Sequence, residues 1–264
     1  PLDKKMIRID SYEDLTDDIV RWLKDYYWQH SIDAFVVGVS GGIDSAVVSS
    51  LCARTGLPTY VVCMPLESKF ENSKLSDIHS KGLAEKYDNV KRIEVELSSV
   101  YDSFLKSVEW WSEAQHYNKK EFTASAHANA NTKSRIRMVT LYQIAGSVGG
   151  IVVGTGNKVE DYGVGFYTKY GDGGVDIAPI ADLYKTEVRE LGRELGVIPE
   201  IINAIPTDGL WEDGRNDEDQ IGASYEQLEE AMETGAGPGL EALQKFYTQN
   251  RHKIDPIPTY KLEV

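Results

Sequence analysis

The residues best suited to chemistry in this chain form one short run: Gly38-Val39-Ser40-Gly41-Gly42-Ile43-Asp44-Ser45. An apolar stretch that predicts a buried strand precedes its glycines, and a small-residue stretch that predicts a helix follows them. Gly41 and Gly42 permit positive φ and close backbone approach, and the two serines add hydroxyl donors. Free N–H groups at a helix start favour an anion, so the run predicts a phosphate site. Asp44 would repel a phosphate unless a cation lay between them, which also predicts Mg²⁺.

The run differs from the common phosphate-binding loops. No Lys-Ser or Lys-Thr pair follows its second glycine, as a Walker A loop requires, and it does not fit G-x-G-x-x-G. Its pattern Ser-Gly-Gly-x-Asp-Ser resembles the pyrophosphate loop of the N-type ATP pyrophosphatases, which cleave ATP between the α and β phosphates. The alternative is a tight turn that binds nothing, but such a turn requires neither two serines nor an aspartate beside two glycines.

A second polar segment, Gly154-Thr155-Gly156-Asn157, follows another apolar stretch, and Glu160 lies three residues further on. Thr155 could bind a nucleotide through its hydroxyl and backbone. Glu160 alone could be an ordinary surface glutamate at a helix start. Together with Asp44, however, it would supply the one or two carboxylates that Mg²⁺ usually takes from a protein, with phosphate and water oxygens completing its coordination.

Apolar stretches alternate with helical patterns through the first part of the chain. We expect buried strands at 33–39, 58–63, 91–95 and 151–154, and helices at about 12–30, 43–54, 71–87, 98–120 and 131–148. This alternation predicts an α/β fold, a doubly wound, mostly parallel sheet with helices on both faces. Ligands bind such sheets at the carboxyl ends of the strands, so the two polar segments should reach one ligand.

The rest of the chain predicts further helices and one long irregular segment. Residues 157–178 are rich in glycine and tyrosine and predict irregular backbone, and helices are expected at about 182–195, 224–233 and 238–250. We find no internal repeat and no low-complexity linker. The simplest division is one domain over 1–264 with a C-terminal helical extension from about 199.

Composition excludes several classes of function. The formal net charge of −14 argues against a nucleic-acid partner, which would need basic groups to neutralise phosphates. No run of about 18 apolar residues predicts a membrane span. Cys52 and Cys63 lie in apolar stretches, which favours buried thiols in a cytoplasmic protein. The five histidines lack the spacing of a zinc site.

Beyond the phosphate loop, motifs spread over roughly residues 10–258 resemble those of the ammonia-dependent NAD synthetase family, and they occur in the family's order. The matching segments are Asn131-Thr-Lys-Ser-Arg135-Ile-Arg137-Met138, Gly154-Thr155-x-Asn157-x-x-Glu160, Tyr167-Thr-Lys-Tyr-Gly-Asp-Gly-Gly174, Pro179 with Leu183-x-Lys185, Pro206-Thr207-Asp-Gly-Leu-Trp211, Asp217-Glu-Asp-Gln-Ile-Gly222-x-Ser-Tyr225 and His252-Lys253.

The resemblance implies an adenine nucleotide alpha hydrolase-like fold and a ligase. Enzymes of this family adenylate the nicotinate carboxylate of deamido-NAD with ATP and Mg²⁺, and ammonia then displaces AMP. The resemblance assigns the metal to Asp44 and Glu160, and catalysis to Asp44, Lys185 and Thr155. The ATP-binding positions that it implies are Gly38, Val39, Ser40, Gly41, Gly42, Ile43, Asp44, Ser45, Thr155, Lys185 and Thr207. The deamido-NAD-binding positions are Arg135, Lys169, Asp176, His252 and Lys253.

The chain departs from the family pattern at one point, because the spacing from Glu160 to Lys169 is one residue longer than in some members. Glutamine-using members carry an additional amidase domain, for which there is no room before Gly38, so free ammonia is the expected nitrogen source, although a separate amidase subunit stays open. The resemblance also implies a homodimer. Two other functions stay open: another ATP pyrophosphatase, such as a GMP synthetase or a tRNA-modifying enzyme, and a nucleotide-binding module without turnover.

Overall fold

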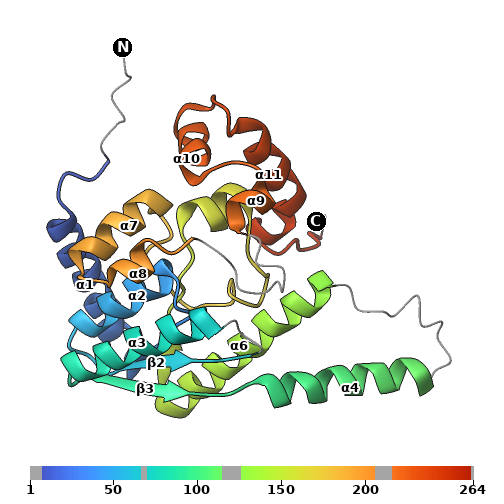
Figure 1. The fold of residues 1–264 in the computed structure, drawn as a ribbon, viewed down its shortest axis with the longest axis horizontal. Coiled ribbons are helices and arrows are strands. Elements are labelled where there is room, and N and C mark those ends of the chain that lie inside the picture. Colours follow the sequence, from blue (N-terminus) through green and yellow to red (C-terminus); the bar gives the residue numbers. More distant parts are fainter. Residues whose placement is uncertain (1–7, 67–69, 115–125, 206–215, 263–264) are drawn as a thin grey trace.

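A four-stranded parallel sheet organises the molecule (Figure 1). The computed structural model describes residues 8–66, 70–114, 126–205 and 216–262. The strands lie in the order β3-β2-β1-β4. Their bounds are β1 Ala34–Gly38, β2 Thr59–Cys63, β3 Val90–Glu94 and β4 Gly150–Val152. β1 and β4 are neighbours, so the polar segments that follow them leave the same edge of the sheet, as the sequence predicts.

Helices account for most of the remaining described residues. Ser11 caps the first helix by accepting a hydrogen bond from the Asp14 N–H. The helices of the first half are α1 Tyr12–Gln29, α2 Ile43–Arg54, α3 Phe70–Lys86, α4 Ser98–Ala114 and α6 Ala126–Val148. Those of the second half are the π-helix η1 Lys158–Val164, α7 Lys185–Glu194, α8 Pro199–Ile202, α9 Asp217–Ile221, α10 Tyr225–Thr234 and α11 Leu240–Ile254.

Both faces of the sheet are covered, which explains why β1 is apolar at every position before Gly38. Phe35 and Val37 face one core with α1 and α2, whereas Val36 faces a second core with α6. All three side chains are fully buried. α3 contributes Leu83 to a third cluster, on the same side of the sheet as α2. The fold therefore has helices on both faces of a parallel sheet, and this part of the prediction is confirmed.

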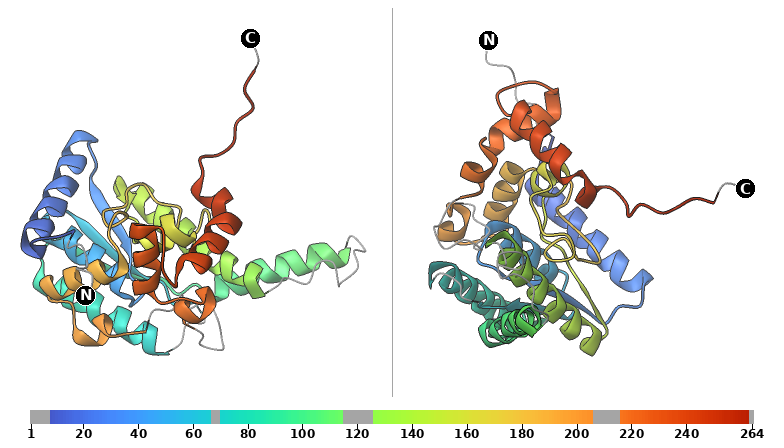
Figure 2. Two further views of the ribbon diagram at one scale, coloured as in Figure 1. Left: turned by 90° about the horizontal axis from the view of Figure 1, so that it is seen from above. Right: turned by 90° about the vertical axis from the view of Figure 1, so that its right-hand side faces the viewer.

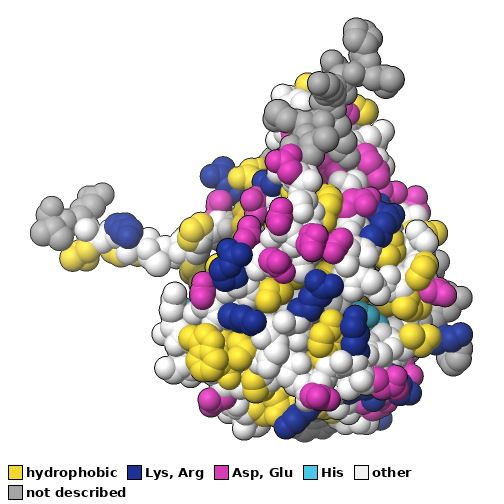
Figure 3. All heavy atoms as spheres, turned by 90° about the vertical axis from the view of Figure 1, so that its left-hand side faces the viewer, with side chains coloured by type: hydrophobic (Ala, Val, Ile, Leu, Met, Phe, Trp, Pro, Cys, Tyr) yellow, Lys and Arg dark blue, Asp and Glu magenta, His cyan; other side chains and the backbone are white. Residues whose placement is uncertain are grey.

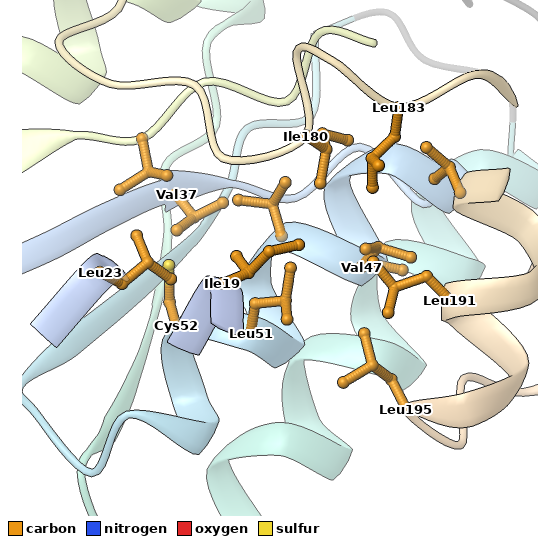
Figure 4. Close-up of a cluster of buried hydrophobic side chains, with 14 of the residues drawn as sticks. Ile19, Leu23, Val37, Val47, Leu51, Cys52, Ile180, Leu183, Leu191 and Leu195 are labelled. Atoms are coloured by element: carbon orange, nitrogen blue, oxygen red, sulfur yellow. The ribbon is translucent and has the colours of Figure 1, made fainter. Parts of the chain in front are cut away.

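The packing of α7 on α2 fixes the position of the first residue of α7. Figure 4 shows Leu191 of α7 and Leu195, the C-cap of that helix, in one buried cluster with Val47 and Leu51 of α2. The two helices approach closely at Gly192, where an added Cβ would lie 2.7 Å from the Ile43 side chain. Displacing α7 from α2 would therefore disrupt the buried cluster that the two helices share.

The C-terminal helices form a separate layer over the carboxyl edge of the sheet (Figures 1 and 2). α10 and α11 pack with η1 around Tyr225, which is fully buried. α4 extends away from the body of the molecule, and this is clearest in the left view of Figure 2.

The structure differs from the sequence prediction mainly within residues 157–178. The sequence predicts irregular backbone throughout this segment, but it begins with η1, and the Gly165 N–H bonds to the Glu160 carbonyl five residues earlier. A turn of π-helix takes up about one residue more than a turn of α-helix. Glu160 therefore lies in a wide helical turn that precedes the remaining loop.

The distribution of charged side chains on the surface agrees with the acidic composition. On the face in Figure 3, acidic side chains lie among lysines and arginines without a continuous basic area. None of the helices in the described part of the chain combines the length and apolar character needed to cross a lipid bilayer. Cys52 and Cys63 are free and buried.

A buried histidine between α2 and α3 makes stability depend on pH. The His79 Nε2 lies 3.0 Å from the Ser49 hydroxyl, and burial lowers the pKa of His79 from 6.5 to about 4. An unfolded histidine binds a proton below pH 6.5, whereas folded His79 does not until about pH 4. This contribution to stability is therefore present above pH 6.5 and is lost as the pH falls toward 4.

We expect the variant His79→Gln, which keeps a hydrogen-bonding group, to reduce the loss of stability between pH 7 and 4.5 by about 2 kcal/mol relative to the wild type. Urea unfolding at several pH values measures this difference. The exposed His30, exchanged in His30→Gln, controls for removal of an imidazole. Parallel pH profiles of the wild type and His79→Gln would contradict the prediction.

Candidate active site

The loop after β1 forms a hydrogen-bonded turn that ends at the first residue of α2. The Ser45 hydroxyl donates to the Gly42 carbonyl (3.0 Å), and the Ser40 N–H donates to the Ser45 hydroxyl (3.2 Å). Gly41 has φ 91°, a conformation that favours glycine. Gly42 has φ −84° and is the N-cap of α2. Positive φ is thus adopted by Gly41 and not by Gly42. Because a glycine cap has no side chain, the first N–H groups of α2 stay available to an anion.

A buried lysine lies directly beside this loop. Lys185 is 3% exposed, and its Nζ lies 2.5 Å from Asp44 Oδ2 and 2.8 Å from Glu160 Oε1. The Tyr225 hydroxyl also donates to Glu160 Oε1 (2.7 Å), and the Asn157 side-chain amide donates to Asp44 Oδ1 (3.4 Å). These five residues form what we call the lysine–carboxylate cluster: Asp44, Asn157, Glu160, Lys185 and Tyr225.

Local capping places each charged member of the cluster. Lys185 is the first residue of α7, whose N-cap Tyr184 donates its N–H to the Glu187 side chain (2.8 Å). Glu160 lies in the first turn of η1, where the Asn157 side chain accepts hydrogen bonds from the N–H groups of Val159 and Glu160 (both 3.1 Å). Asp44 is the second residue of α2. Three helix N-termini therefore meet at one point.

The charges in the cluster stabilise one another against burial. Burial lowers the pKa of Lys185, but attraction from Asp44 and Glu160 outweighs it, so the pKa is raised overall. Burial raises the pKa of Glu160, and the Lys185 ammonium with the hydrogen bond from Tyr225 lowers it further than burial raises it. Burial is the dominant effect on Asp44 and raises the pKa of its carboxyl despite Lys185. The ammonium is thus retained at neutral pH.

The two carboxylates fit a divalent metal ion that arrives with a phosphate ligand. Both offer oxygens, the donor that Mg²⁺ prefers, and both reach the same point, because Lys185 contacts them together. Within the described ranges, no group of three or more His, Cys, Asp and Glu side chains could hold a metal. The remaining ligands would therefore have to come from phosphate oxygens and water.

The other predicted ATP-binding positions lie at this edge of the sheet or outside the described residues. Val39 is buried, and its N–H donates to the Val62 carbonyl (2.9 Å), so it continues the sheet pairing. Thr155 lies in the segment that joins β4 to η1 and is partly buried. Thr207 lies outside the described residues.

Four of the five predicted deamido-NAD positions are joined through backbone carbonyls. Arg135 on α6 donates to the Lys169 carbonyl (3.2 Å), and Lys169 Nζ donates to the His252 carbonyl (2.7 Å). Lys253 Nζ donates to the carbonyls of Gly165 (2.9 Å) and Tyr167 (2.8 Å). α11 is thereby tied to the loop that follows η1.

The fifth position, Asp176, makes different contacts. Its carboxylate accepts hydrogen bonds from the Val152 N–H of β4 (2.8 Å) and the Tyr142 hydroxyl of α6 (3.0 Å). Asp176 is therefore held against the sheet, whereas the other four positions lie in the group around α11.

A small cavity adjoins the lysine–carboxylate cluster. Its volume is about 170 Å³, and among its lining residues are two acidic side chains, Asp161 and Asp172. Burial, reinforced by the nearby Glu160, raises the pKa of Asp161 to about 8. The Ser134 hydroxyl donates to Asp172 (2.7 Å). The cavity lining comprises Gly154, Gly156, Asp161, Tyr162, Tyr167, Asp172, Gly173, Val175, Ala178 and Ile254.

Sequence reasoning did not assign three residues that the structure places at this edge. Asn157 carried a signal, since it belongs to a matching segment and asparagine is a residue type favoured at N-caps. Arg137 carried a weaker one as a second arginine close to Arg135 on the same helix, and its Nε donates to the Met64 carbonyl at the end of β2 (3.2 Å). Tyr225 ends one of the matching segments, but nothing in the sequence pairs it with Glu160, which lies 65 residues away.

The chain matches one protein-family profile and a curated relative over most of its length. The profile of the family described as NAD synthase matches residues 15–254. The chain is 36% identical over 245 residues to an NH(3)-dependent NAD(+) synthetase of Alkaliphilus metalliredigens, covering 91% of this chain and 96% of that protein.

Two solved structures have the same fold. An NMN synthetase from Francisella tularensis superimposes with a TM-score of 0.85 at 31% identity, covering 96% of this chain and all of that one. An NH3-dependent NAD synthetase from Campylobacter jejuni has a TM-score of 0.73 at 24% identity, with 96% of this chain and all of that one covered.

The contact between Gly156 and Asp161 leads to a test of the cavity wall. A Cβ on residue 156 would lie 2.0 Å from Asp161 Oδ2. The short aspartate side chain could relieve this clash only by moving out of the cavity wall. We expect Gly156→Ala to lower the melting temperature and to reduce turnover by about 10²-fold, as small displacements of reacting groups do.

Calorimetric melting and a turnover assay measure both effects. Gly146→Ala in α6 is the matched control, because nothing lies within 4 Å of its added Cβ. If the clash is the cause, the double variant Gly156→Ala/Asp161→Ala recovers the melting temperature. A Gly156→Ala protein as stable and active as the Gly146→Ala protein would refute the prediction.

Proposed function

Since the chain belongs to the NAD synthase family, we propose that it catalyses the ATP-dependent amidation of deamido-NAD to NAD with ammonia, releasing AMP and pyrophosphate. This is the reaction of a ligase that forms a C–N bond. The observation that carries the proposal is the lysine–carboxylate cluster beside the open N-terminus of α2, because it combines a phosphate site, a metal-binding pair of carboxylates and a cation.

The reaction needs activation before amidation, because a free carboxylate has no adequate leaving group for ammonia to displace. A nicotinate carboxylate oxygen attacks the α-phosphorus of ATP, and the bond to the β-phosphate bridging oxygen breaks, releasing pyrophosphate. Ammonia then attacks the acyl carbon of the adenylate, loses a proton, and AMP leaves with the former carboxylate oxygen. No covalent enzyme intermediate is required, so the protein contributes position and charge.

The cluster matches the first step. Asp44 and Glu160 would hold Mg²⁺, which when bound offsets negative charge on the phosphates. The N-terminal N–H groups of α2 and the Ser40 hydroxyl can donate to pyrophosphate oxygens. Lys185 supplies the cation that a Walker A loop would provide from within the loop itself.

The group around α11 would bind the substrate that is amidated. Arg135, Lys169, His252 and Lys253 bring positive or polar side chains to one region of the carboxyl edge, next to the cavity lined by Asp161 and Asp172. This placement supports binding of an anionic nucleotide beside the ATP site.

We further propose that the protein forms a homodimer, since α1 exposes two large aromatic side chains, Trp22 (43%) and Trp28 (69%). Exposed tryptophans of this kind are enriched where a second chain packs. A cytoplasmic location stays a prediction.

Nicotinic acid mononucleotide is a second candidate substrate, because the chain is similar to an NMN synthetase at 31% identity and a TM-score of 0.85. Amidation of this mononucleotide would use the same adenylation chemistry on the same carboxylate. The two substrates differ only in the adenylate half of the dinucleotide. The lysine–carboxylate cluster would serve both reactions equally, so substrate kinetics must separate them.

Release of pyrophosphate from ATP in the presence of Mg²⁺ and ammonium tests the proposal. We expect release to depend on deamido-NAD and the product to be NAD. Parallel reactions contain nicotinic acid mononucleotide or xanthosine monophosphate. A larger kcat/KM with the mononucleotide would replace deamido-NAD by that substrate. Release that requires xanthosine monophosphate, or none with any acceptor, would refute the proposal.

Removing one charge from the cluster tests its role. We expect Asp44→Asn to reduce the rate of adenylation by about 10²–10³-fold while the far-ultraviolet circular dichroism stays unchanged, because one electrostatic contact to the transition state is lost. The matched control is Asp182→Asn, since the Asp182 side chain is 84% exposed. Equal rates in both variants would argue against a function of Asp44 in catalysis.

A further inference from the structure

The two carboxylates that fit a divalent metal ion already share a cation from the protein. Lys185 Nζ contacts one oxygen of Asp44 and one of Glu160, at 2.5 and 2.8 Å. An oxygen pair that converges on an ammonium also converges on a metal ion placed at the same point. Mg²⁺ needs its oxygens about 2.1 Å away, so Lys185 Nζ and the metal cannot occupy this point together.

Alternative ligands for the metal are scarce. Among the described residues no third His, Cys, Asp or Glu completes a metal-binding group with these carboxylates. The carboxylates also have further partners. The Asn157 amide donates to Asp44 Oδ1, and the Tyr225 hydroxyl donates to the same Glu160 oxygen that contacts Lys185. A metal ion that uses the two oxygens facing Lys185 Nζ would therefore have to replace the ammonium.

Lys185 can leave the carboxylates without movement of its helix. Its backbone is fixed at the first position of α7, by the Tyr184–Glu187 capping interaction and by the packing of α7 on α2. The four-carbon side chain can still rotate about its own bonds. The N-terminus of α2, which attracts anions, contains Asp44 itself and so lies within the same cluster.

The charges of these groups explain why a metal ion would replace Lys185 only when phosphate is present. Asp44, Glu160 and Lys185 together carry a formal charge of about −1 when all are ionised. A divalent ion entering alone meets the ammonium at close range in a poorly solvated place, where repulsion is strong. A triphosphate at the α2 N-terminus adds negative charge, supplies ligands to the metal and offers the ammonium a new partner.

We propose that Lys185 and the divalent metal ion compete for Asp44 and Glu160, so that the metal enters only with ATP, as Lys185 moves from the carboxylates to the phosphates. Lys185 is then a positioning residue that blocks metal binding in the absence of nucleotide, in addition to its role toward ATP. The inference relies on the proposed function only for the use of a nucleotide with a metal ion.

Binding of Mn²⁺, followed by electron paramagnetic resonance without any acceptor substrate, tests the competition. We expect the wild-type protein to bind Mn²⁺ weakly when alone and tightly with α,β-methylene-ATP, which is not cleaved between these phosphates. Lys185→Met should bind Mn²⁺ alone about tenfold more tightly than the wild type or better, because the opposing charge is gone. Equal affinity of both proteins for Mn²⁺ alone would overturn the proposal.

Two further variants separate the effect of the lysine charge from that of its side-chain length and packing. Lys185→Arg keeps a positive charge and should keep Mn²⁺ affinity low, whereas Lys185→Met/Glu160→Gln removes one ligand and should lose the gain. Because Lys185→Met leaves two buried carboxylates without their cation, it is expected to be less stable.

Stability gives an independent readout. Mn²⁺ should raise the melting temperature of Lys185→Met by several degrees, and that of the wild type much less, since a bound ion stabilises the folded state. If Mn²⁺ does not stabilise Lys185→Met in this way, that result would also count against the proposal. These readouts involve no amidation, so they stay interpretable if the proposed substrate proves wrong. An inactive protein with the expected Mn²⁺ pattern would refute only the proposed function.

Discussion

Two carboxylates from distant parts of the chain, Asp44 and Glu160, hold the ammonium of Lys185 in a setting that is almost closed to water. Each of these three charges would be unfavourable if it were buried alone, so each requires the others in place. The constraint extends to the elements that carry them. α2, η1 and α7 must all begin at one point, and the α2–α7 packing and the Asn157 cap bring them there.

The C-terminal helices connect this arrangement to the region proposed to bind the amidated substrate. Tyr225 at the start of α10 reaches Glu160, and Lys253 near the end of α11 bonds to the loop after η1. The elements around the lysine–carboxylate cluster are thus connected to those that would hold the amidated substrate. The widened turn of η1 lies between them and carries both Glu160, in the cluster, and Asp161, in the cavity wall.

Much of the sheet and of the helices around it could be predicted from local sequence patterns. The apolar strands and the helices between them follow from periodicity, and the meeting of the loops after β1 and β4 follows from parallel topology. The conformation of Gly42 was less predictable, because glycine permits positive φ without requiring it. The π-helix was not predictable either, since a widened turn has the same residue types as irregular backbone.

By itself the sequence determined the parallel α/β fold and the family and predicted the phosphate loop, because these depend on short runs of residues whose order and type are read directly. Only the tertiary structure decided that Lys185 binds the same carboxylates a metal would bind, and that Tyr225 joins them. The reason is physical. A pair interaction across 141 residues depends on how two helices pack, and neither residue carries a local signal of its partner.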